Sequence, residues 1–131
     1  FQHWLYTNPG HGRDARREAW FDIYTRFQPF ADWTAREENR DWMWQKQRHL
    51  FASPFYYIEY AIAQIGALQA WINDREDHVA TVAAYRKSLR LGGSRRLPQL
   101  FETAGLQFAM DREMLGKLIP RVMARIEELE G

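Results

Sequence analysis

Apolar residues recur at helical spacing along every long segment of the chain. No segment alternates apolar and polar residues as a half-buried strand would, and no Asn-Gly or Asp-Gly pair marks a hairpin. The pattern therefore predicts an all-α fold. Proline, glycine and capping residues divide it into elements, because they start or stop helices. The predicted helices are 1–7, 14–27, 34–51, 54–73, 98–104 and 111–130, with a further helix that Asp74 or Asp77 caps and Gly92 ends.

Three boundaries rest on particular residues. The segment 1–7 is expected to be the end of a helix begun elsewhere, since nothing precedes Phe1 to cap it. Ser53 followed by Pro54 predicts an N-cap and a first helical residue. Pro120 predicts a kink or, as the favoured alternative, a fresh helix start near Ile119.

The segment 54–71 places Tyr56, Tyr57 and Tyr60 at the start of an apolar helix with only one formal charge. Two apolar stripes run along this helix, which predicts a central, buried position. Buried tyrosine hydroxyls need hydrogen-bond partners. These donors are therefore expected either to stabilise a polarised carbonyl or phosphoryl oxygen or to be ordinary core aromatics.

Composition and charge narrow the classes of function. The chain of 131 residues is 46% hydrophobic, which suffices for one domain with a core. Its net charge of +1, with both signs dispersed, gives no sign of a nucleic-acid or membrane partner. The absence of cysteine excludes disulfides and thiolate metal sites and fits a cytoplasmic protein. The apolar run 61–72 is too short to span a bilayer, so a soluble protein is expected.

The four histidines, His3, His11, His49 and His78, do not form a zinc-binding motif. None belongs to an H-E-x-x-H sequence, and His3 and His11 lie across a proline-glycine turn. No zinc is therefore expected to bind this chain by itself.

Several segments together carry a family resemblance: 1–6, 47–51, 54–71, 91–94 and 97–106. In order and spacing they resemble the C-terminal end of oligoendopeptidase F-like zinc metallopeptidases, relatives of thimet oligopeptidase. The resemblance implies that residues 1–131 are one helical segment, the C-terminal part of a larger and mostly helical catalytic domain. It also implies that the zinc helices, with H-E-x-x-H and a further glutamate, lie upstream of Phe1.

The resemblance further implies a function. The parent enzyme would hydrolyse short peptides with zinc, and this chain alone would be inactive. Its expected partners are short peptides and the missing N-terminal catalytic portion, and the isolated chain is expected to self-associate. A noncatalytic helical binding or assembly module is the alternative. An H-E-x-x-H motif encoded upstream of Phe1 in the same reading frame would distinguish the peptidase from the binding module.

In the resembling enzymes a histidine and a Y-x-x-Y pair bind the scissile carbonyl and help to stabilise the oxyanion. His49, Tyr57 and Tyr60 match that pattern, and Tyr56 is a further substrate-binding candidate. Two departures accompany the match. Residues 51–54 replace the glycine-rich loop of thimet-type enzymes, and the alignment of the histidine with both tyrosines needs a gap of about one residue.

Overall fold

The computed structural model describes all 131 residues, and its regular structure is entirely helical. The prediction of an all-α fold is confirmed. The chain forms two compact units, Phe1–Tyr57 and Ile58–Gly131, each of which is described by itself. That the whole chain is one segment of a peptidase catalytic domain stays a prediction.

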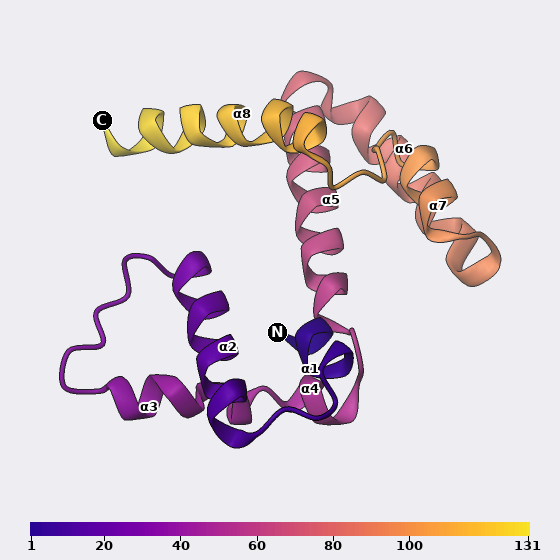
Figure 1. Cartoon of the computed structure of the whole chain (residues 1–131). Helices are drawn as coiled ribbons and strands as arrows, with labels where there is room; N and C mark the ends of the chain where they lie inside the picture. The colour runs from indigo at the N-terminus through magenta and orange to yellow at the C-terminus, as the bar shows by residue number, and fades with distance from the viewer. The chain divides into compact units, whose positions relative to one another are not determined.

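Four α-helices and one 3₁₀ turn make up the first unit (Figure 1). An aromatic cluster forms its core, with Trp44 only 7% exposed. The ring centroid of Phe1 lies 5.2 Å from that of Trp20 and 5.8 Å from that of Trp44, and the centroid of Phe51 lies 5.9 Å from that of Trp44. The elements are α1 (Gln2–Thr7), α2 (Arg13–Phe27), α3 (Glu37–Trp42), the 3₁₀ turn η1 (Met43–Lys46) and α4 (Arg48–Ala52).

The predicted continuous helix over 34–51 is wrong, because α3, η1 and α4 replace it. Gln47 leaves the helical region, with φ −81° and ψ 82°. No proline or glycine breaks this segment, so local propensity does not explain the interruption. Trp44 in the 3₁₀ turn is the buried centre of the aromatic cluster. We infer that its packing overrides the helical preference of the segment.

The predicted helix start at Ser53 and Pro54 is also wrong. Ser53 ends α4, and α5 (Tyr57–Glu76) begins only at Tyr57. Phe55 adopts the left-handed conformation, with φ +58°, so it cannot belong to the first turn of a helix. The N–H of Tyr56 donates to the carbonyl of Ser53 at 3.2 Å, which closes a turn instead.

The remaining helices belong to the second unit, which α5 enters at Ile58. Its core consists of Ile72, Ala104, Met114 and Leu118. Helices α6 and α7 pack side by side (Figure 1), and the hydroxyl of Ser88 joins them by donating to the carbonyl of Leu100 at 2.8 Å. The elements are α6 (His78–Leu91), the 3₁₀ turn η2 (Gly92–Ser94), α7 (Leu97–Thr103) and α8 (Arg112–Glu130).

The end of α6 follows the prediction, and of the two predicted caps, Asp74 and Asp77, it is Asp77 that caps the helix. The carboxylate of Asp77 accepts from the N–H of Ala80 at 2.9 Å. The left-handed Gly92 ends the helix, with φ +49°. A fresh start near Ile119 is wrong, since α8 runs through Pro120 without interruption. A proline at 120 deprives the carbonyl of Gly116 of its helical partner, and Gly116 is exposed, so water can take that bond.

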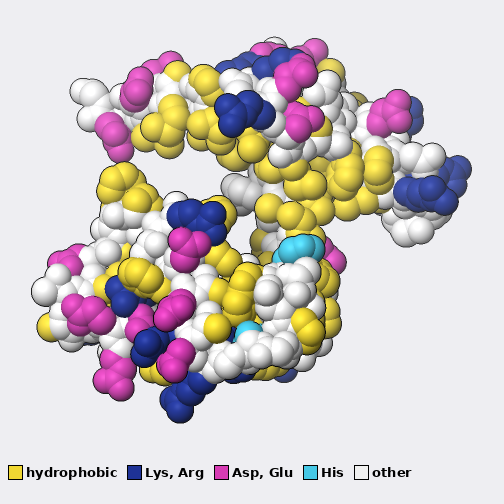
Figure 2. Space-filling view, viewed as in Figure 1, with side chains coloured by type: hydrophobic (Ala, Val, Ile, Leu, Met, Phe, Trp, Pro, Cys, Tyr) yellow, Lys and Arg dark blue, Asp and Glu magenta, His cyan; other side chains and the backbone are white.

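The expected central position of α5 is wrong. Only Gly66, Gln69 and Ile72 are buried, and none of them lies in the first two turns of the helix. Ile58 and Tyr60 are 52% and 54% exposed in its first turns. Hydrophobic side chains also lie at the surface along α8 (Figure 2). No helix of the structure combines the length and the apolar character needed to cross a membrane.

Candidate functional site

Three of the four predicted site residues lie together in the first unit. The imidazole of His49 stacks on the ring of Tyr56, with centroids 4.9 Å apart and an interplanar angle of 10°. The ring of Tyr57 meets the same imidazole edge-on, at 5.1 Å and 79°. Helix α4 presents His49, and the turn over 53–56 brings the chain back so that both tyrosines meet it.

This turn depends on the left-handed Phe55. The N–H of Phe55 donates to the side-chain Oε1 of Gln2 at 3.0 Å. The ring of Phe55 also packs against Tyr6 of α1, with centroids 5.4 Å apart. Gln2 is only 9% exposed, so its amide is a firm anchor. Helix α1 therefore fixes the turn that places Tyr56 and Tyr57 against His49.

Gln47, which the sequence did not mark as a site residue, contacts one of these side chains. The hydroxyl of Tyr57 donates to its side-chain Oε1 at 2.6 Å. A hydroxyl has one proton to donate. Donation from Tyr57 to a substrate carbonyl therefore requires this bond to be exchanged. Gln47 lies ten residues before Tyr57, and no local sequence pattern marks that pairing.

Tyr60 lies three residues after Tyr57 on α5 and belongs to the second unit. Its side chain is 54% exposed, and Tyr56 and Tyr57 are each 38% exposed. None of the three is a core residue of this structure. The alternative that these tyrosines are buried core aromatics is therefore not supported. Exposed phenol hydroxyls and an imidazole can donate hydrogen bonds to the carbonyl oxygen of a bound peptide.

The histidines do not meet at a metal site. His11 lies between the carbonyl of Asn8, 2.6 Å from its Nδ1, and the guanidinium of Arg16, 2.8 Å from its Nε2. The Nδ1 of His78, the first residue of α6, lies 2.7 Å from the carboxylate of Asp74 near the end of α5. No three side chains of histidine, cysteine, aspartate or glutamate gather where they could hold a metal ion. The residues of this chain therefore do not fit a zinc ion.

Comparison with known proteins gives one result. A family model described as Peptidase family M3 matches residues 1–118 of the 131. No curated protein and no solved structure matches the chain. The family match covers the cluster of His49, Tyr56 and Tyr57 (the His49 cluster) as well as α5, and it confirms the metallopeptidase relationship predicted from the sequence. The chain belongs to peptidase family M3, a family of metallopeptidases.

Proposed function

We propose that this chain supplies the carbonyl-binding side chains of a zinc-dependent oligoendopeptidase of the oligoendopeptidase F type. Its substrates are short peptides. Membership of peptidase family M3 supports the reaction class. The observation that carries the assignment of the site is the cluster of His49, Tyr56 and Tyr57, which forms although its members come from two separate helical elements and a turn.

In this proposal His49, Tyr57 and Tyr60 donate hydrogen bonds to the carbonyl oxygen and neighbouring backbone of the substrate. Negative charge grows on that oxygen as the carbonyl carbon becomes tetrahedral. Donors already in place strengthen as the charge develops, so they stabilise the transition state more than the bound peptide.

Tyr56 and Gln47 have supporting roles in the proposal. The ring of Tyr56 lies flat against His49 and fixes the plane of the imidazole beside the bound peptide. Gln47 holds the hydroxyl of Tyr57 at 2.6 Å until a substrate carbonyl replaces it. Preorientation of donors lowers the cost of reorganisation during the reaction.

The proposal assigns zinc and the glutamate that activates water to sequence outside residues 1–131. Within the chain no three potential ligand side chains gather where they could hold a metal ion. The chain by itself is then inactive, and it works in the cytoplasm as part of a larger catalytic domain. An H-E-x-x-H motif encoded upstream of Phe1 is the first observation to seek.

The test of the site uses the intact enzyme with His49→Ala, Tyr57→Phe and the combined variant. Each single change is expected to lower kcat, and the double change should lose less than the product of the single losses, since the residues act on one step. Tyr85→Phe is the matched control, a 51% exposed tyrosine on α6. Unchanged kcat in both single variants, with unchanged melting temperatures, would contradict the proposal.

A further inference from the structure

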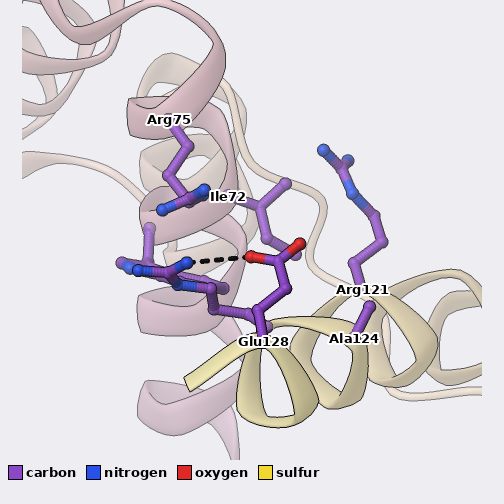
Figure 3. Close-up of a pocket in the computed structure, with 7 residues that line it drawn as sticks. Ile72, Arg75, Arg121, Ala124 and Glu128 are labelled. Carbon is purple, nitrogen blue, oxygen red and sulfur yellow. Dashed lines mark hydrogen bonds and ion pairs between the residues drawn. The ribbon is translucent and has the colours of Figure 1, made fainter. Parts of the chain in front are cut away.

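A small pocket of the second unit lies between α5 and α8. Its volume is about 90 Å³. Figure 3 shows Ile72 and Arg75 of α5 facing the same space as Arg121 and Glu128 of α8. Trp71, Ala124 and Arg125 complete the lining. None of these residues belongs to the His49 cluster.

The charges around the pocket do not cancel. Arg121 pairs with Glu76, and Arg125 pairs with Glu128 at 2.8 Å. Arg75 takes part in no ion pair of the chain. Its guanidinium instead lies over the ring of Trp71, 5.6 Å from the ring centroid. Three cations thus face two anions, and Arg75 is the one without a counterion.

A carboxylate is the ligand that fits these features. The planar guanidinium of arginine matches a carboxylate through two parallel hydrogen bonds. Ile72 is 5% exposed and forms an apolar wall of the pocket, which strengthens charged hydrogen bonds there. The small volume suits a carboxylate with a few water molecules rather than a large side chain.

The position of the pocket along α5 relates it to Tyr60. Trp71 lies eleven residues after Tyr60 on the same helix. Eleven residues correspond to a rise of about 16 Å and to roughly three full turns, so both side chains leave nearly the same side of α5. An extended peptide covers about 16 Å with roughly five residues.

We propose that this pocket binds the free C-terminal carboxylate of the peptide substrate, about five residues beyond the carbonyl held by Tyr60. The inference rests on the proposed function for the carbonyl position, and it deepens that function by naming the substrate class. The enzyme would then prefer short peptides with a free C-terminus. Arg75 is the residue that recognises the carboxylate.

Binding to the full 131-residue chain tests the pocket without catalysis. Two N-acetylated hexapeptides of alanine and serine, one ending in a free acid and one in an amide, are titrated while NMR follows the Trp71 indole and the Arg75 guanidinium. The acid is expected to bind at least about 10-fold more tightly, the effect of one charged hydrogen-bonded pair. Equal affinities would overturn the proposal.

Variants identify the residue responsible. Arg75→Gln should remove the preference for the acid, whereas Arg86→Gln, an equal loss of charge at an exposed position of α6, should preserve it. Arg125→Gln is a second pocket variant, expected to weaken the preference if Arg75→Gln fails to fold. A preference that survives the loss of Arg75 or Arg125 in a folded chain would refute the assignment.

A third peptide, an amide with one internal glutamate, separates the two sources of a carboxylate. It should bind no better than the plain amide, and affinity equal to that of the acid would overturn the assignment to the C-terminus. Tyr60→Phe should leave the preference for the acid unchanged. Equal binding of the acid and the amide by the wild-type chain would therefore refute the carboxylate pocket alone. Unaltered turnover in Tyr60→Phe would refute the role of Tyr60 at the carbonyl alone.

Discussion

At the scale of single residues, Gln69 of α5 holds the chain at Gln107 through both ends of its amide. Its Nε2 donates to the carbonyl of Gln107 at 3.0 Å, and its Oε1 accepts from the N–H of Gln107 at 2.9 Å. One turn later, the Nδ2 of Asn73 donates to the carbonyl of Gly105 at 3.1 Å. These bonds satisfy backbone groups that no helix pairs, and they fix the segment between α7 and α8.

Gln69→Leu should therefore destabilise the chain. It removes two hydrogen bonds and leaves both backbone groups of Gln107 without their partner, for an expected loss of about 2–4 kcal/mol in the free energy of unfolding. Urea denaturation measures this change. Gln64→Leu at an exposed position of the same helix is the control, expected to lie within about 0.5 kcal/mol of wild type. Equal stability of the two variants would show that the hydrogen bonds between Gln69 and Gln107 contribute nothing to the free energy of unfolding.

The same scale explains why the candidate site was predicted only in part. His49, Tyr57 and Tyr60 were identified from residue type and a family resemblance. Gln2 and Gln47, which hold the turn and the Tyr57 hydroxyl, were not. The partner of Gln2 lies 53 residues away and that of Gln47 lies 10 residues away. Such pairings depend on the folded path of the chain, which local sequence patterns do not contain.

At the scale of elements, the sequence predicted helix ends wherever capping chemistry decides them. The carboxylate of Asp111 accepts from the N–H of Met114 at 2.8 Å and starts α8, as Asp77 starts α6. The predicted helix boundaries were wrong where tertiary packing decides the boundary. The interruption around Trp44 and the left-handed Phe55 follow from contacts with α1 and with the aromatic cluster. Pro120 stays inside α8, against its local preference.

Two helical glycines differ in what surrounds them, and this difference gives a test. A Cβ on Gly116 of α8 would meet no atom within 4 Å, whereas one on Gly66 of α5 would lie 2.9 Å from the ring of Phe101. Gly116→Ala should raise the free energy of unfolding by about 0.5–1 kcal/mol, because alanine favours the helix.

Gly66→Ala should gain less or destabilise the chain, since Phe101 must move while it packs edge-on against Phe108 at 5.3 Å. Thermal unfolding of Gly116→Ala and Gly66→Ala measures the difference in stability between the two substitutions. An equal gain at the two positions would show that the close approach of Phe101 has no energetic consequence.

At the scale of the whole molecule, α8 has an apolar side without cover from Ile119 to Leu129. Ile119, Met123, Ile126 and Leu129 are between 39% and 69% exposed and recur every three or four residues. Exposed apolar stripes of this kind are typical of interfaces. We expect the remaining catalytic portion to cover this side in the intact enzyme and a second copy to cover it in the isolated chain.

The isolated chain should therefore self-associate as its concentration rises, and sedimentation equilibrium should detect this. Replacing Met123 and Ile126 by lysine places two charges on the stripe and should shift the chain towards the monomer. Val79→Lys, at a 78% exposed position of α6, should not. A wild-type chain that stays monomeric at millimolar concentration would contradict the expectation.

The central claim is that His49, Tyr57 and Tyr60 donate hydrogen bonds to the substrate carbonyl. Tyr60→Phe tests it most directly, because it removes one hydroxyl and keeps the ring. In the intact enzyme kcat should fall by about 10²–10³, with KM and the melting temperature little changed. If the hydroxyl of Tyr60 had only a structural role, Tyr60→Phe would lower the melting temperature and leave turnover intact. An unchanged kcat for Tyr60→Phe would contradict the account.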